Sequence, residues 1–177
     1  PYYMARLNEM VRTFSDYMND LTTSGVDENG DAGLDMFTAE DPQGNDYVFV
    51  GSMEGAGTIA STDSTYYRLT ALNWELNQAW KTDPAKVVVS YEDDIAQGNV
   101  EARPILDKII FGMTDQSMFE QGSVSQFMQS ITTTLAVDIA KAEVFAANQD
   151  DIRYTIDNQR QSVSGVDQNE EASNLTK

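Results

Sequence analysis

From residue 123 to 164 the chain reads SVSQFMQSITTTLAVDIAKAEVFAANQDDIRYTIDNQRQSVS, and no glycine or proline interrupts it before Gly165. Its apolar residues recur at three- and four-residue steps, the spacing of one face of an α-helix. The stripe comprises Val124, Phe127, Met128, Ile131, Leu135, Ala142, Phe145, Ile152, Ile156 and Val163. Asp138, Gln149 and Gln159 fall on the same heptad track and weaken it. A helix of about forty residues spans ~60 Å and predicts a bundle or coiled coil, because one helix alone cannot bury its apolar face.

Both ends of this stretch carry helix signals. Ser123 followed three residues later by Gln126 is a capping-box pattern. Gly165 is expected to end the helix, after which Asp167 and Glu170 form a second capping pattern. That pattern predicts a terminal helix of about two turns, a length that is marginal in isolation.

The N-terminal segment has the same periodicity. Its apolar residues are Leu7, Met10, Val11, Phe14, Tyr17, Met18 and Leu21. They predict an amphipathic helix within residues 1–24, with Gly25 as a left-handed C-terminal cap. We expect the two stripes to pack on each other.

Between residues 25 and 98 the helical period fades. Residues 46–50 predict a short strand, and the glycine-rich residues 55–57 a hairpin loop. Residues 76–80 and 84–86 each predict one helical turn, and residues 87–89 are strand-like.

A further helix is expected after residue 98. Asn99 is one possible N-cap, and Pro104 at the first helical position is the other. Ile105, Leu106, Ile109 and Ile110 form its apolar face, and Gly112 is expected to end it.

Composition excludes several classes of function. The chain is 41% hydrophobic and has 29 acidic against 11 basic residues, a net charge of −18. Nucleic-acid backbones and anionic membrane surfaces attract basic proteins, so we expect neither as a partner. Cysteine and histidine are absent, which excludes disulfides, thiolate metal sites and Ser-His-Asp or Cys-His catalysis.

The sequence has no apolar run that reaches the ~20 residues of a membrane helix. We also expect no signal peptide at its start. Because Pro1 is followed at once by helix-like sequence, we expect a piece cut from a longer protein.

Four residue groups suggest chemistry, and each has a simpler interpretation. Asp27-x-Asn29-x-Asp31 resembles the start of a calcium loop, but Ala32 and Thr38 replace its glycine and glutamate, which favours a turn. Residues 51–57 lack the lysine of a phosphate-binding loop. The acidic run 92–94 could supply paired carboxylates but is typical of a solvated surface. Tyr66, Tyr67, Trp74 and Trp80 could stack on sugars, and we expect them in a core.

The residues Ser162-Val163-Ser164-Gly165-Val166-Asp167, followed by Glu170-Glu171-Ala172-x-Asn174-Leu175, resemble a motif of axial flagellar proteins. Three upstream segments, in matching order, narrow the resemblance to the hook-associated protein 1 family, the hook–filament junction proteins. They are residues 25–38, 77–87 and 119–123. Asp167 and Gln78 depart from the family pattern, which has Asn and Pro there. The family's N-terminal half and the end of its last helix are missing.

The resemblance implies a structural protein, with no enzymatic activity and no cofactor. It implies export by the flagellar secretion system to an extracellular place in the bacterial flagellum, where the protein supports motility and filament assembly. The implied partners are other copies of the chain in a junction ring, the hook protein, the second hook-associated junction protein and an export chaperone. The chaperone's site would lie mostly in the missing part.

We therefore expect an α+β, mainly α fold: a long-helix bundle with a partly β, loop-rich insert. Residues 1–24 and 99–165 would form a rod-like helical domain, residues 25–98 a connecting insert, and residues 166–177 the start of a terminal helix. The expected helix-packing interface is Leu7, Val11, Phe14, Met18, Leu21, Met128, Ile131, Leu135, Phe145, Ile152 and Ile156. The expected interdomain joint is Ser162, Val163, Ser164, Gly165, Val166, Asp167, Glu170, Glu171 and Leu175. The alternatives are another axial flagellar protein, of hook or rod type, and a surface carbohydrate-binding module in the insert.

Overall fold

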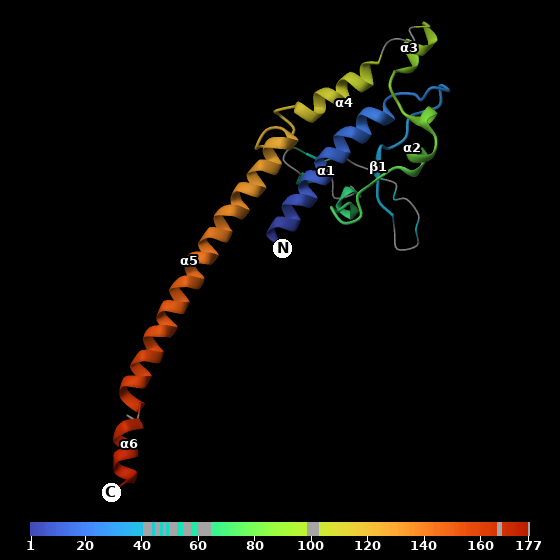
Figure 1. Cartoon of the computed structure of the whole chain (residues 1–177). Coiled ribbons are helices and arrows are strands. Elements are labelled where there is room, and N and C mark those ends of the chain that lie inside the picture. Colours follow the sequence, from blue (N-terminus) through green and yellow to red (C-terminus); the bar gives the residue numbers. More distant parts are fainter. Residues whose placement is uncertain are drawn as a thin grey trace. The chain divides into compact units, whose positions relative to one another are not determined.

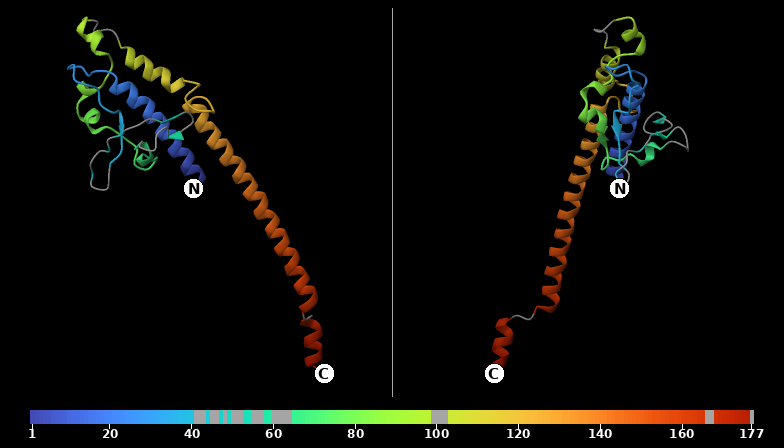
Figure 2. Two further views of the ribbon diagram at one scale, coloured as in Figure 1. Left: turned by 180° about the vertical axis from the view of Figure 1, so that it is seen from behind. Right: turned by 90° about the vertical axis from the view of Figure 1, so that its right-hand side faces the viewer.

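Two helices far apart in the sequence, α1 (Tyr2–Thr23) and α4 (Pro104–Thr114), lie side by side in the computed structural model (Figures 1 and 2). The structure describes residues 1–40, 44, 47, 49, 53–54, 58–59, 65–98, 103–165 and 168–176. By its internal contacts the chain divides into two units, Pro1–Ile131 and Thr132–Lys177. The chain is mainly helical, as the sequence predicts.

Short elements complete the first unit. β1 (Phe37–Thr38) pairs antiparallel with β4 (Glu75–Leu76), and β2 (Met53–Glu54) pairs antiparallel with β3 (Thr58–Ile59). The short helices are η1 (Tyr66–Arg68), α2 (Gln78–Thr82), η2 (Pro84–Lys86) and α3 (Glu92–Ala96). The long helix α5 (Val124–Ser164) begins in the first unit and continues into the second, which also contains α6 (Gln168–Leu175).

Three buried clusters hold the first unit together. Val11 of α1 packs with Ala39, Tyr66 and Leu69. Met118, Phe119, Phe127 and Ile131 form a second cluster around the start of α5. Trp80, Val88 and Ile105 form the third. Since α1 and the residues around it contribute to all three clusters, this helix is the centre of the unit.

Polar side chains of α1 also bind the backbone around it. Asn19 is 1% exposed, accepts from the backbone N–H of Phe37 at 2.8 Å and donates to the carbonyl of Phe37 at 2.9 Å. Its amide also donates to the Tyr66 hydroxyl at 3.2 Å. Arg12 donates to the carbonyl of Leu69 at 2.7 Å. These bonds satisfy peptide groups that would otherwise be buried without a partner.

Two glycines have other roles than the sequence predicts. The C-cap of α1 is Ser24 in a right-handed conformation, and Gly25 does not have a positive φ. A Cβ on Gly25 would overlap the Cδ1 atom of Ile105, so this glycine permits close packing instead of a helical cap. Gly112 does not end α4, which continues to Thr114. A Cβ there would overlap the ring of Tyr17, so Gly112 lets α1 and α4 approach each other.

The local predictions for residues 76–114 are partly confirmed. Pro104 is the first residue of α4, and η2 occupies residues 84–86, as expected. The turn expected at 76–80 begins two residues later, because Leu76 pairs in β4. The strand expected at 87–89 is wrong: Val88 is fully buried without a ladder partner, and the only backbone bridge nearby among the described residues is at Ser90.

Other predictions fall on residues that the structure does not describe. They are most of the strand expected at 46–50, the loop at 55–57, and the N-cap at Asn99. The strands β2 and β3, on either side of residues 55–57, pair as the two arms of a hairpin would.

Candidate functional site: the apolar stripe of α5

The start of α5 is fixed by the predicted capping box. The backbone N–H of Ser123 donates to Oε1 of Gln126 at 2.9 Å, and the N–H of Gln126 donates to Oγ of Ser123 at 3.5 Å. Gly122 precedes them with a φ of +107°, a conformation that glycine adopts without strain. A bridge between Gly122 and Phe119 closes the turn that leads into the helix.

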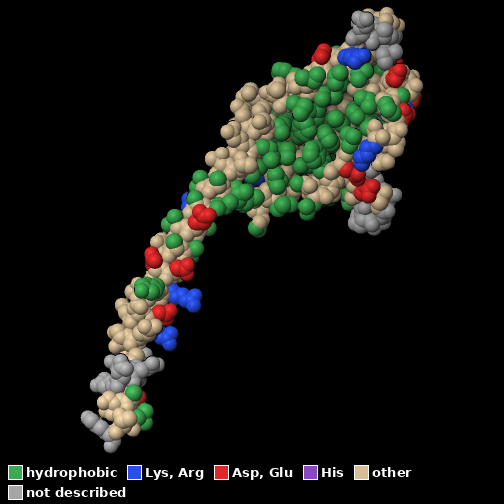
Figure 3. All heavy atoms as spheres, in the orientation of Figure 1, with side chains coloured by type: hydrophobic (Ala, Val, Ile, Leu, Met, Phe, Trp, Pro, Cys, Tyr) green, Lys and Arg blue, Asp and Glu red, His purple; other side chains and the backbone are tan. Residues whose placement is uncertain are grey.

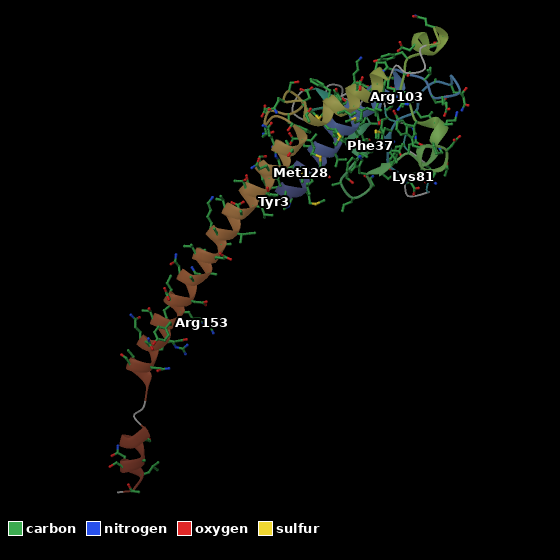
Figure 4. The ribbon with its side chains drawn as sticks, turned by 45° about the horizontal axis from the view of Figure 1, so that its top comes forward. Tyr3, Phe37, Lys81, Arg103, Met128 and Arg153 are labelled. Carbon is green, nitrogen blue, oxygen red and sulfur yellow. The ribbon has the colours of Figure 1, made fainter. Side chains whose placement is uncertain are left out.

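The first two turns of α5 are anchored in the core of the first unit. Phe127 is fully buried, with its ring centroid 4.5 Å from that of Phe119, and the Arg6 guanidinium lies 4.5 Å from the Phe127 centroid. Ile131 is 8% exposed. Met128 is half-buried and packs against the same cluster as Tyr3 of α1 (Figure 4).

Beyond these anchors, every described side chain of residues 132–163 is exposed. The predicted stripe runs through this part of the helix: Leu135 is 40% exposed, Phe145 65%, Ile152 52% and Ile156 49%. Exposed apolar side chains also lie off the stripe, among them Val144 and Tyr154. Figure 3 shows hydrophobic side chains at several places along α5.

An exposed helix of this length depends on packing for its stability. Propensity alone makes isolated helices marginal, and a fully buried aliphatic or aromatic side chain contributes about 1.5–3 kcal/mol. The stripe of α5 carries four large apolar side chains that are now exposed and that a partner could bury: Leu135, Phe145, Ile152 and Ile156. A surface of this kind is typical of a site for packing against another helix.

The predicted interface residues of α1 do not all face α5. Leu7 and Phe14 are half-buried and join the cluster of Phe127 and Ile131. Val11 and Met18 are each 1% exposed, with Val11 in the cluster formed with Ala39, Tyr66 and Leu69. Leu21 packs against the cluster of Trp80, Val88 and Ile105. The structure thus brings together Leu7, Phe14, Met128 and Ile131 and separates the rest.

The half-buried stripe of α1 also contributes to the surface. Leu7, Met10, Phe14, Tyr17 and Leu21 follow one heptad track, and all five keep part of their surface exposed. Apolar side chains gather over α1 on the face of the first unit that Figure 3 shows. Such a patch is a second place where another protein surface could pack.

The predicted joint lies at the end of α5. The helix ends at Ser164, and the N–H of Gly165 donates to the carbonyl of Gln161 at 2.7 Å. Val163 and Leu175 are 88% and 82% exposed, and Ser162 and Glu171 are also exposed. Val166, Asp167 and the side chain of Glu170 lie outside the described residues. The helix α6 follows, as the sequence predicts.

A lysine occupies the turn that resembles a calcium loop. The Asp27 carboxylate is 2% exposed, accepts from the N–H groups of Asn29 and Asp31, and pairs with Nζ of Lys86 at 2.8 Å. The same Nζ atom lies 2.7 Å from the Asp31 carboxylate. The hydrogen bond from Lys86 holds the pKa of Asp27 below its usual value, and burial opposes this shift. The geometry is that of a turn closed by an ion pair.

The other chemical candidates take ordinary positions. Tyr66 and Trp80 are buried, which confirms the core prediction, and Trp74 packs with Phe37 at a centroid distance of 4.9 Å. Tyr67 is 51% exposed, so its core prediction is wrong: successive residues of a 3₁₀ turn point in different directions.

The described acidic residues do not converge on a metal site. Glu92 of α3 is exposed and Asp94 is half-buried. Among the described residues there is no group of three or more carboxylates placed to hold a metal ion. A cavity of about 570 Å³ lies beside the ion pair, lined by Asp27, Glu28, Pro84, Val87, Val89, Ser90 and Arg103. Its buried carboxylate is already paired with Lys86.

Sequence reasoning missed the polar residues that bind the loops to α1. Asn8 accepts from the N–H of Ala71 at 2.9 Å, and Arg12 and Asn19 bind backbone groups in the same way. Residues 8, 12 and 19 are four and seven apart, so they lie on one side of the helix. This shared side of the helix could have indicated that the three residues contact other parts of the chain, because polar residues that only face solvent need not lie on one side.

Comparison with protein-family models gives no match for this chain, and neither a curated protein nor a solved structure matches it. Within the part of the chain that the structure describes, no helix has the length and apolar character needed to cross a membrane.

Proposed function

We propose that the chain is a structural component of the bacterial flagellum that joins the hook to the filament through packing of helical subunits. The observation that carries the proposal is the exposed apolar stripe of α5 between Leu135 and Ile156. The motif around Ser162–Leu175 and the three upstream segments support the same family. A protein with this role works mechanically, without catalysis or a cofactor.

In this proposal the stripes of α1 and α5 are packing surfaces of a rod-like, long-helix bundle made from residues 1–24 and 99–165. Residues 25–98 form a partly β connecting insert. Residues 166–177 begin a terminal helix, and the segment around Ser162 to Val166 joins that helix to the rod-like domain. Burial of the stripe would supply free energy for packing the subunit against a neighbouring helix in the flagellum.

The same proposal gives the location and the partners of the chain. The chain is exported by the flagellar secretion system and acts outside the cell. It assembles with other copies of itself into a junction ring, between the hook protein and the second hook-associated junction protein, and an export chaperone accompanies it. The net charge of −18 keeps the exposed parts soluble in the medium.

Deletion of the gene in a motile host tests the proposal. We expect electron micrographs of the deletion strain to show hooks without filaments, with unassembled filament subunits in the medium. Re-expression of the complete gene is the control and should restore filaments. Normal filaments in the deletion strain would refute the proposal, and loss of the hooks themselves would favour the hook- or rod-type alternative.

A further inference from the structure

The charged residues of the exposed part of α5 are sorted around its apolar stripe. In the heptad of the stripe, Leu135, Ala142, Gln149, Ile156 and Val163 occupy position a, and Asp138, Phe145, Ile152 and Gln159 occupy position d. The positions that flank this seam are e and g, and the outer positions are b, c and f.

All three basic residues of this part flank the seam. Lys141 is at a g position, and Arg153 and Arg160 are at e positions. Four of the five acidic residues are at the outer b and c positions: Glu143, Asp150, Asp151 and Asp157. The fifth, Asp138, lies in the seam itself. Figure 4 labels Arg153 on the helix.

The basic side chains remain accessible to a partner. Lys141 lies 3.7 Å from Asp138 and Arg160 lies 3.9 Å from Asp157, in pairs whose side chains are all at least half exposed. Exposed ion pairs at such distances contribute little to stability, so carboxylates of a partner can compete for Lys141 and Arg160.

Two copies of α5 packed through their stripes would have no oppositely charged residues to pair beside the seam. Flanking residues meet flanking residues across a two-helix interface, and in this seam they include three bases and no acid. A parallel in-register pair would also place Asp138 against its own copy. Like charges at these positions oppose association, so the pattern disfavours a second copy as the occupant.

We infer that the stripe of α5 between Leu135 and Val163 docks an amphipathic helix of another protein whose apolar seam is flanked by acidic residues. This inference rests on the proposed function and specifies the partner chemistry of that surface. Lys141, Arg153 and Arg160 select the partner by charge, and Phe145, Ile152 and Ile156 supply the buried contact. An anionic membrane is the less suitable occupant, because Asp138, Gln149 and Gln159 interrupt the stripe that would enter the lipid.

Designed helical peptides of about four heptads test the inference with the chain of residues 1–177. One labelled peptide has glutamate at e and g, and the other has lysine there, with the same apolar seam. In fluorescence anisotropy at low salt we expect the acid-flanked peptide to bind at least about tenfold more tightly. Salt at about 0.5 M should reduce this preference, because it screens exposed charges.

Charge-reversed variants supply the matched control. The double variant Arg153→Glu with Arg160→Glu should reverse the preference toward the lysine-flanked peptide. Lys81→Glu with Arg103→Glu changes the net charge equally at exposed sites of the first unit and should leave the preference intact (Figure 4). Circular dichroism verifies that both variants keep the helical content of the parent chain.

Several outcomes would overturn the inference. They are equal affinity for the two peptides, binding of neither, or a preference that survives reversal of Arg153 and Arg160. Sedimentation that shows a stable dimer through α5 would identify a second copy as the occupant. Tighter binding to vesicles of phosphatidylcholine with phosphatidylglycerol than to either peptide would identify a membrane. A deletion strain that lacks filaments would leave the proposed function standing in each of these cases.

Discussion

Replacement of Asn19 by alanine removes three hydrogen bonds at once from the centre of the first unit. The side chain is 1% exposed and binds the N–H and carbonyl of Phe37 at 2.8 and 2.9 Å and the Tyr66 hydroxyl at 3.2 Å. Each buried polar group left without a partner costs about 1–3 kcal/mol, and the higher helix propensity of alanine offsets about 0.5 kcal/mol. We expect the free energy of unfolding to fall by about 3 kcal/mol, which corresponds to roughly 10 °C in Tm for a unit of this size.

Urea unfolding followed by tryptophan fluorescence measures this loss. Trp74 lies 4.9 Å from the Phe37 ring, centroid to centroid, so its emission should report on the docking of β1 against α1. Asn19→Asp should be at least as destabilising at pH 7, because it buries a carboxylate that faces the Phe37 carbonyl and cannot donate to it. Asn29→Ala, at an exposed position, is the matched control. If the free energy of unfolding of Asn19→Ala stays within about 0.5 kcal/mol of the parent's, the hydrogen bonds of Asn19 do not hold β1 against α1.

Two further substitutions test the packing around Asp27 and Gly25. The pKa of Asp27 is held below its ordinary value of 3.8, so the ion pair with Lys86 stabilises the fold fully above that pH and loses its effect as pH falls through the lower folded value. Lys86→Met should therefore lower the free energy of unfolding at pH 7 and flatten its decline as the pH falls below about 4. Lys81→Met, which breaks an exposed ion pair, should change neither in urea titrations across pH. Gly25→Ala should destabilise by about 1–3 kcal/mol in thermal melts, because its Cβ would overlap Ile105, and an unchanged Tm would contradict that packing.

The long elements could be predicted from the sequence because their signals are local. The apolar spacing from Leu7 to Leu21 and from Val124 to Val163 predicts helices that the structure contains as α1 and α5. Pro104 at the start of α4 and the pairing of Ser123 with Gln126 depend on residues within one turn. Such features need no knowledge of what packs nearby.

The glycines and the packing partners could not be predicted in this way. Gly25 packs closely against Ile105, and Gly112 against Tyr17, so neither position has room for a Cβ atom. These partners are about eighty to ninety-five residues away in the chain, so no local pattern indicates them. The pairing of Lys86 with Asp27 joins residues 59 positions apart. The apolar spacing predicts the stripe of α5 but does not show where its burial ends. Ile131 is buried and the stripe residues beyond it are exposed, although both follow the same spacing.

Complementation of the deletion strain with stripe variants tests whether α5 packs in the flagellum through its apolar stripe. Phe145→Lys with Ile152→Lys places two charges on the seam, and Val144→Lys with Tyr154→Lys places the same two charges on outer positions that are 62% and 70% exposed. We expect the outer pair to restore filaments in electron micrographs. The seam pair should leave hooks without filaments although the protein is exported at the parent's level. Normal filaments with the seam pair would contradict a packing role for the α5 stripe.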